Sequence, residues 1–171
     1  MTDPVTEGNG PSPKSGDHFL TMPIITTVLL GAPLAIHWCS PDNAAIVLSW
    51  LGIAATAAIL LGFFGSLLVK GLGPSRGIIK VLYIAAVGIA SLILHFAALY
   101  RWTGMIGPGD QHSTSWADAF YFSVVTWTTL GYGDFRPVSE ARYIVIVEVM
   151  LGYVIMALLI STFVSTIQRQ R

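Results

Sequence analysis

The sequence predicts an all-α membrane protein with four transmembrane helices and one shorter helix that enters the membrane without crossing it. Of its 171 residues, 54% are hydrophobic and 11% are charged, and the mean hydropathy is +0.70. This composition is too apolar for a soluble domain of this size. The apolar residues also gather in four runs, each about long enough to cross a bilayer. These runs occupy residues 19–38, 44–69, 78–100 and 143–167.

The amino-terminal part of the chain is predicted to hold a tail and two peripheral helices. Residues 1–18 are rich in Gly, Pro and Ser and lack apolar periodicity, which predicts a disordered tail. Residues 19–77 then contain the first two spans. Pro33 lies inside the first span and should kink or shorten its helix. The second span is longer than about 20 residues and should therefore tilt or protrude.

The third span is followed by a segment of a different kind. A helix is predicted over residues 78–101, and a polar loop comes after it. Ser115 and, three residues later, Asp118 form a capping-box start for a second helix over residues 116–128. This helix is too short to cross a bilayer. Because non-helical backbone is tolerated at membrane depth only where protein or water covers it, a helix that enters and stops needs such cover.

The segment after this short helix reads Thr-Leu-Gly-Tyr-Gly-Asp over residues 129–134. An ion that leaves water needs its hydration shell replaced, and a ring of backbone carbonyls can replace it. Pointing successive carbonyls at one axis requires residues with positive φ, which glycine adopts without penalty. Gly131 and Gly133 therefore suit a carbonyl cage, and the hydroxyl of Thr129 can add an oxygen below it. The alternative is a Gly-rich surface turn, which the flanking apolar runs disfavour.

This motif resembles the selectivity filter of the tetrameric potassium channels, whose signature is Thr-x-Gly-Tyr-Gly-Asp. The resemblance covers about residues 78–167 and implies a pore module over residues 78–171. Within it, residues 78–101 are the outer helix, residues 116–128 the pore helix and residues 143–167 the inner helix.

The same resemblance implies that residues 129–133, which we call the filter loop, hold the permeant ion. The backbone carbonyls of its residues are the expected K⁺ ligands: Thr129, Leu130, Gly131, Tyr132 and, at the outer end, Gly133. Asp134 is expected at the extracellular mouth. Leu130 replaces the more usual Val or Ile, and this change concerns the packing behind the loop more than ion selection.

One filter loop supplies one carbonyl to each ring, whereas the cage needs four, so a homotetramer in a lipid bilayer is expected. K⁺ is then the permeant ion, and no cofactor is expected. The sequence shows no nucleophile motif, phosphate loop or Cys/His spacing typical of a metal site, so no enzyme activity is predicted. With 9 basic and 9 acidic residues the net charge is zero, and nothing indicates a nucleic-acid partner.

Two residues before the filter loop are candidates for its support. Some members of the family carry an acid at the position of Val125, which pairs with the Asp after the filter. Here Tyr121, one turn earlier, can donate its hydroxyl to Asp134 instead, or it can be a membrane-interface tyrosine. Thr128, which joins the short helix to the loop, is the second candidate.

The last span is predicted to line a cavity below the filter loop. If Val154 faces the axis, about 100° per residue places further residues on the same face. This face comprises Val154, Ala157, Leu158, Ser161 and Ser165. The serines suit a water-filled cavity, although serine can also bond its own helix backbone. Gly152 is a hinge candidate, with a close helix contact as the alternative.

Glu148 is an acid inside this span, where an ionisable group is costly and is normally paired or functional. It lies about 120° from the face that Val154 defines, so it should point at protein behind the filter loop. His95 is one candidate partner, because it lies at a similar depth in the outer helix. The hydroxyls of Ser123 and Thr126 are another, and a lone protonated acid is the third alternative.

Charge predicts the orientation in the cell membrane. With the filter loop outward, six basic residues lie inside against three outside, and both termini are cytoplasmic. The inner set is Lys14, Lys70, Arg76, Lys80, Arg169 and Arg171. No span before the filter loop carries regularly spaced Arg or Lys, and the few residues after residue 167 hold no ligand-binding domain. Neither a voltage sensor nor a ligand-binding domain is therefore expected.

The predicted function is passive K⁺ conduction through a central pore of four subunits. A non-selective cation channel and a non-conducting regulatory subunit are the alternatives. A transporter subunit with several linked pore loops is disfavoured, because this sequence has one loop with the full motif.

Overall fold

The computed structural model describes residues 42–70 and 78–168 of the chain. The tail predicted over residues 1–18 and the span predicted over residues 19–38 lie outside the described residues.

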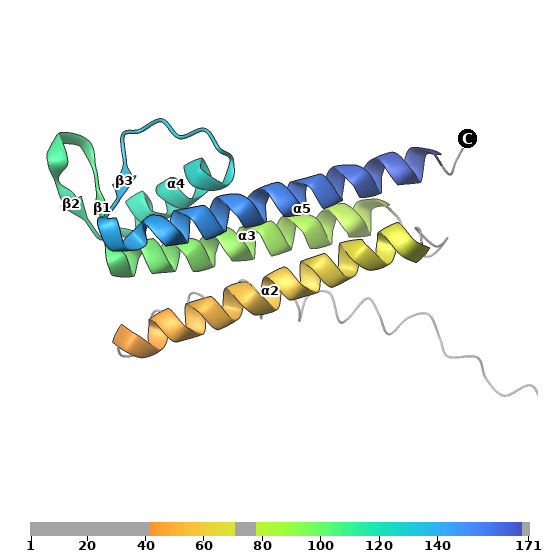
Figure 1. Cartoon of the computed structure of the whole chain (residues 1–171), viewed down its shortest axis with the longest axis horizontal. Helices are drawn as coiled ribbons and strands as arrows, with labels where there is room; N and C mark the ends of the chain where they lie inside the picture. The colour runs from red at the N-terminus through yellow and green to blue at the C-terminus, as the bar shows by residue number, and fades with distance from the viewer. Residues whose placement is uncertain (1–41, 71–77, 169–171) are drawn as a thin grey trace, which may run out of the picture.

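Three long helices lie side by side along the molecule (Figure 1). They are α2 (Asp42–Lys70), α3 (Ile78–Thr103) and α5 (Arg142–Gln168). Each contains a segment long and apolar enough to cross a membrane: Ile46–Leu68, Val81–Thr103 and, with the turn that precedes α5, Ser139–Ser165. Helix α2 packs against both α3 and α5. The chain is an integral membrane protein of largely helical structure.

The segment between α3 and α5 folds back over one end of these helices (Figure 1). Its short helix is α4 (Trp116–Trp127), which packs mainly on α3 and also contacts α5. Three two-residue strands accompany it: β1 (Met105–Ile106), β2 (His112–Ser113) and β3 (Arg136–Pro137). They form an antiparallel sheet in the order β2-β1-β3, in which Met105 pairs with Ser113 on one side and Pro137 on the other. Two single 3-10 turns, Pro108–Asp110 and Ser139–Ala141, complete the segment.

Helix α3 continues past residue 101, where the sequence predicted its end. Gly104 ends it, with a φ of +81° and its N–H donating to the Tyr100 carbonyl at 2.8 Å. This is a glycine helix stop in the left-handed conformation. A side chain at Gly104 would also collide with the ring of His112, since a Cβ would lie 2.2 Å from it.

Close contact between α2 and α3 depends on two glycines. A Cβ at Gly52 of α2 would lie 2.3 Å from the His95 ring, and one at Gly88 of α3 would lie 2.5 Å from Leu60. Small residues at such crossings allow helix backbones to approach closely in a membrane, where packing rather than water exclusion drives association. The largest side chains that are fully buried lie on these two helices: Leu60, Phe64, Leu67, Leu92, Phe96, Leu99 and Tyr100.

Candidate functional site

Helix α4 begins at a hydrogen-bonded cap. The Ser115 hydroxyl accepts from the Asp118 N–H at 3.1 Å, as the capping-box pattern predicted. In a full capping box the Asp118 side chain would also accept from the Ser115 N–H. Here the Asp118 carboxylate accepts from the Ser113 hydroxyl instead, at 2.6 Å. Ser113 in turn accepts from the Ser115 N–H at 3.2 Å, so β2 is tied to the start of the helix.

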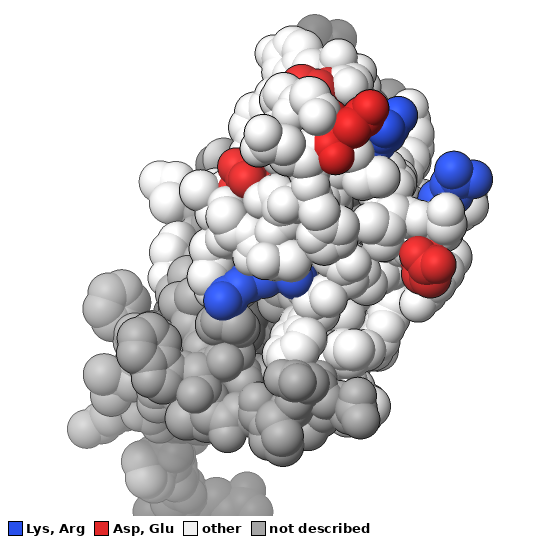
Figure 2. Space-filling model, turned by 90° about the vertical axis from the view of Figure 1, so that its left-hand side faces the viewer, with Lys and Arg blue, Asp and Glu red and all other residues white. Residues whose placement is uncertain are grey.

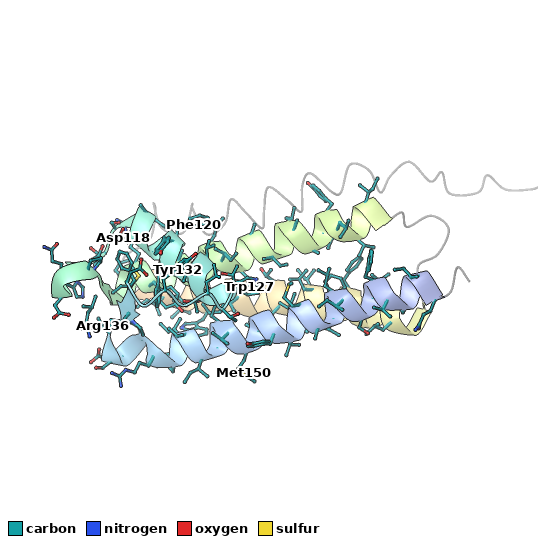
Figure 3. The ribbon with its side chains drawn as sticks, turned by 90° about the horizontal axis from the view of Figure 1, so that it is seen from above. Asp118, Phe120, Trp127, Tyr132, Arg136 and Met150 are labelled. Carbon is teal, nitrogen blue, oxygen red and sulfur yellow. The ribbon has the colours of Figure 1, made fainter. Side chains whose placement is uncertain are left out.

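The carbonyl end of α4 leads directly into the filter loop. The Thr128 N–H donates to the Val124 carbonyl and the Leu130 N–H to the Val125 carbonyl, both at 3.0 Å. The Thr128 hydroxyl also donates to Val124, at 2.7 Å. Thr128 therefore stabilises the last turn of α4, and the negative end of the helix dipole lies beside the loop. Figure 3 shows Trp127 at this end of α4, and Tyr132 in the loop that follows.

The backbone of the filter loop alternates in the sign of φ. Thr129, Gly131 and Gly133 have φ values of +58°, +51° and +78°, whereas Leu130 and Tyr132 between them do not have positive φ. Such alternation turns successive peptide groups so that their carbonyls can face one side. The positive φ predicted at Gly131 and Gly133 is confirmed. That of Thr129 was missed, because a positive φ costs a non-glycine residue about 1–2 kcal/mol and is not expected from its sequence.

The filter loop is open to its surroundings in the single chain. Its five residues are all exposed, with Leu130 at 58% and Tyr132 at 67%. A Cβ at Gly131 or Gly133 would meet no atom of the described residues within 4 Å. These two glycines are therefore needed for their backbone conformation and not for space within one chain.

Tyr121 and Asp134 join α4 to the outer end of the filter loop. The Tyr121 hydroxyl donates to Asp134 Oδ2 at 2.7 Å, so of its two predicted alternatives the hydrogen bond is present. This bond raises the pKa of Tyr121. The Asp134 Oδ1 accepts from the Phe135 N–H at 3.1 Å, and the Phe135 ring packs edge-on against Tyr121 at 5.7 Å.

Glu148 lies behind the filter loop, where its side chain is fully buried. Its Oε1 lies 2.6 Å from the Ser123 hydroxyl of α4, and its Oε2 lies 2.6 Å from the Tyr100 hydroxyl of α3. The predicted partner Ser123 is therefore confirmed, whereas Thr126 is not bonded to the acid. Tyr100 was missed. A single carboxyl group joins three helices at this point.

His95, the other candidate partner of Glu148, is not bonded to it. The His95 ring packs on Gly52 of α2, and its Nδ1 has no hydrogen-bond partner among the described residues. The depth of His95 was judged from the end of the apolar run at residue 100, but α3 continues to Thr103, so His95 lies deeper below the end of its helix. Tyr100 is five residues from His95, about 140° around the helix, so the two side chains leave on different faces.

Gly152 of α5 lies against the end of α4. A Cβ there would be 3.4 Å from the Trp127 carbonyl oxygen, and α5 runs through this position without a break. The close helix contact, one of the two alternatives for Gly152, is therefore present. Its role as a hinge stays a prediction.

The predicted cavity face of α5 is only partly exposed in the single chain. Val154, Ala157 and Ser161 are exposed, whereas Leu158 is half-buried against the chain's own core. The Ser165 hydroxyl donates to the Thr162 carbonyl at 2.9 Å. At Ser165 the alternative of a bond to the helix backbone therefore holds.

Charged side chains gather at the end of the molecule that carries the sheet and the filter loop (Figure 2). Arg136 of β3 forms an ion pair with Asp110, and both side chains are largely exposed. On the same side, the Arg101 guanidinium lies 5.2 Å from the centre of the Trp116 ring. The ion pair joins β3 to the Pro108–Asp110 turn, and the contact between Arg101 and Trp116 joins the end of α3 to the start of α4.

Comparison with known proteins assigns the chain to a family. A family model described as an ion channel matches residues 82–169, which include α4, the filter loop and α5. The chain belongs to this ion-channel family. This match and the similarity to a potassium channel given below confirm the resemblance to pore-loop potassium channels that was inferred from the sequence.

The chain is 28% identical to Protein LctB of Bacillus caldotenax, over 66% of this chain and 91% of that protein. It is also 28% identical to Protein LctB of Geobacillus stearothermophilus, over 71% of this chain and 98% of that protein. A shorter match is 47% identical to Two-pore potassium channel 4 of Arabidopsis thaliana, over 28% of this chain and 17% of that protein. No solved structure matches the chain.

Proposed function

We propose that this chain forms a K⁺-selective channel, in which the filter loops of four copies surround one axis. The observation that carries the proposal is the alternating sign of φ over residues 129–133 in a loop that is exposed along its whole length. Carbonyls that face one side form a line of oxygen ligands, and four such lines form a cage that replaces the hydration shell of the ion. The ligands are then the carbonyls of Thr129, Leu130, Gly131 and Tyr132, with Gly133 at the outer end.

The surface left uncovered by one chain supports assembly with further copies. Large apolar side chains are exposed on α5 and in the filter loop: Leu130, Tyr132, Tyr143, Ile146, Met150, Tyr153 and Val154. In a homotetramer the filter loops and the adjoining face of α5 meet their counterparts around the axis. In a closed fourfold ring every copy makes the same contacts with its neighbours, whereas a dimer supplies only half of each carbonyl ring.

Helix α4 is then a re-entrant pore helix, covered by the outer and inner helices as such a segment requires. The residues of α5 that line the cavity below the filter loop are Val154, Ala157 and Ser161. The fourth span that the sequence predicts over residues 19–38 lies outside the described residues and is part of this proposal. With the filter loop outward, the basic residues favour an orientation with both termini in the cytoplasm and the chain in the cell membrane.

Ion flux from liposomes that contain the purified chain tests this proposal. We expect K⁺ efflux that Na⁺ does not match under the same gradient, and a tetramer by native mass measurement. Equal K⁺ and Na⁺ flux would identify a non-selective cation channel. A tetramer that conducts neither ion would identify a regulatory subunit, and both outcomes would overturn the proposal.

A further inference from the structure

Three contacts between oxygen atoms surround Glu148, Tyr100 and Ser123, and each is short enough for a hydrogen bond. If Glu148 is ionised, the two hydroxyl groups supply only two hydrogens for these three contacts. The Ser123 hydroxyl oxygen lies 2.6 Å from Glu148 Oε1 and also 3.0 Å from the backbone carbonyl oxygen of Ile93. The Tyr100 hydroxyl oxygen lies 2.6 Å from Glu148 Oε2. Glu148 and Ser123 are fully buried, as is Tyr100.

Counting the hydrogens assigns the donors. Ser123 has one hydroxyl hydrogen, and the Ile93 carbonyl has none to give, so the bond between them uses the hydrogen of Ser123. The contact between Ser123 and Glu148 Oε1 then needs a hydrogen from the carboxyl group. Tyr100 supplies the hydrogen for Oε2. A proton on Glu148 therefore allows all three hydrogen bonds at once. Glu148 donates to Ser123, Ser123 donates to the Ile93 carbonyl, and Tyr100 donates to Glu148.

An ionised Glu148 leaves the group incomplete. Two hydroxyls can donate to a carboxylate, and a length of 2.6 Å is ordinary for neutral and charged O–H···O bonds alike, so the lengths do not decide. In that arrangement, however, the Ser123 hydroxyl no longer donates to Ile93. The charge would also be fully buried, with hydroxyls as its hydrogen-bond partners and no Lys, Arg or His of residues 42–70 and 78–168 paired with it. Such a charge inside a membrane protein is costly.

The surroundings of Glu148 hold few other titratable groups. From α3 the titratable side chain in contact is Tyr100, while His95 on the same helix packs on α2. From α4 the contact is the hydroxyl of Ser123, and Asp118 of that helix bonds to Ser113 at its far end.

We propose that Glu148 is a neutral carboxylic acid that donates to Ser123 and accepts from Tyr100, and that it thereby positions α4 between α3 and α5. Because the filter loop continues directly from α4, the hydrogen bond between Glu148 and Ser123 of α4 sets the position of the loop. Glu148 is a positioning residue in this account and does not touch the ion. The protonation state stands by itself, whereas the effect on ion selectivity rests on the proposed function.

Glu148→Gln and Glu148→Leu separate a neutral acid from a charged one. The amide NH₂ of glutamine can donate to Ser123 and its carbonyl can accept from Tyr100, so glutamine reproduces the neutral acid but not a carboxylate. Leucine has a similar volume and leaves the Tyr100 hydroxyl buried without its acceptor. Ser123→Ala, which removes the receiving hydroxyl and keeps Glu148, serves as a second variant if Glu148→Leu does not assemble.

The experiment is an infrared difference spectrum at neutral pH between the wild-type tetramer and the Glu148→Gln tetramer, with Tm and the K⁺/Na⁺ flux ratio measured on the same samples. We expect the wild type to show a carboxylic-acid C=O band, shifted in D₂O, that Glu148→Gln lacks. Glu148→Gln should keep the wild-type Tm and flux ratio, whereas Glu148→Leu should lower the Tm by about 2–10 °C and reduce the flux ratio.

Loss of a carboxylate band in the Glu148→Gln spectrum, in place of an acid band, would overturn the proposal. So would a Tm for Glu148→Gln as low as that of Glu148→Leu. If the wild type conducts K⁺ and Na⁺ equally, the proposed function fails, but the infrared band and the Tm still decide the state of Glu148.

Discussion

The back and the front of the filter loop differ in the contacts that one chain provides for them. Behind the loop, Glu148, Tyr100 and Ser123 are buried and bonded to one another, and Gly152 contacts Trp127 closely. At the front, residues 129–133 are exposed, and a Cβ at Gly131 would meet no atom of residues 42–70 and 78–168 within 4 Å. The support of the loop therefore lies within one chain, whereas the ion path of the proposed channel needs further copies of the chain.

This difference predicts that changes at the front and at the back have different consequences. The backbone conformation of Thr129 is unfavourable by itself and persists only if surrounding structure holds it. The hydrogen bonds at the end of α4 and behind it provide that support. Changes at the front should alter ion selection without loss of assembly, and changes at the back should alter both together.

We expect the largest functional effect from Gly131→Ala at the front. Gly131 has a φ of +51°, where a Cβ is unfavourable, so alanine should turn its peptide group and remove one carbonyl per subunit from the proposed ion sites beside it. Selectivity for K⁺ over Na⁺ should be lost or strongly reduced, while the tetramer persists in native mass measurement. Tyr132→Val should act in the same direction. Unchanged selectivity in both variants would remove the filter assignment.

Gly152→Leu tests the back of the filter loop. A leucine side chain would press on the Trp127 carbonyl, which lies 3.4 Å from the position of a Cβ, and overpacking of this kind costs about 1–3 kcal/mol. We expect a lower Tm together with reduced selectivity. Gly62→Leu on α2 is the matched control, because a Cβ there meets no atom within 4 Å in the part of the chain that the structure describes. Equal effects in the two variants would contradict a specific contact between α5 and α4.

Gly152→Ala addresses the hinge hypothesis separately. A single Cβ nearly fits beside Trp127, so the stability should change little. If Gly152 is a hinge, the open probability of reconstituted channels should nevertheless fall, since alanine narrows the backbone freedom at this point. An unchanged open probability would leave the close contact as its only role.

The helices and the two glycines of the filter loop could be predicted because the sequence signals for them are local. Apolar runs of membrane length located α2, α3 and α5, and the Ser115 cap located α4. Tyr100 was missed because the run of apolar residues ends there, while the helix continues to its stop at Gly104. The strands were missed because two residues are too few to show an alternating pattern.

Tyr121→Phe should have an intermediate effect on the outer end of the filter loop. It removes the hydroxyl that donates to Asp134 and leaves the ring packed on Phe135. We expect a partial loss of selectivity, smaller than in Gly131→Ala, and no further loss when Asp134→Asn is added. Additive losses in this double-mutant cycle would show that the two residues act independently.

The Tyr121 bond should also give the channel an alkaline limit. The hydrogen bond to Asp134 raises the pKa of Tyr121 above its ordinary value of 10.0, so the hydroxyl keeps its proton at neutral pH. The contribution of the bond is present below the ordinary pKa and is lost as the pH rises through the raised value. Selectivity of the wild type should therefore be constant up to about pH 10 and then fall toward that of Tyr121→Phe. If the selectivity of the wild type already falls below about pH 10, and Tyr121→Phe abolishes this fall, the assignment to Tyr121 is contradicted.

The smallest effect is expected at the ion pair on the surface. Arg136 and Asp110 are 61% and 82% exposed, so replacing Arg136 by Gln should cost less than about 1 kcal/mol of stability. The change in Tm should shrink further at high salt, because salt screens exposed charges. A cost that is larger and insensitive to salt would show that this pair is covered in the assembled channel.

The proposed K⁺ selectivity determines the reversal potential of the wild-type channel when K⁺ is on one side of the membrane and Na⁺ is on the other. If the filter loops form a carbonyl cage for K⁺, the current should reverse far from zero, at a voltage whose sign follows the K⁺ gradient. A reversal close to zero from tetramers of the intact chain would contradict a K⁺-selective pore.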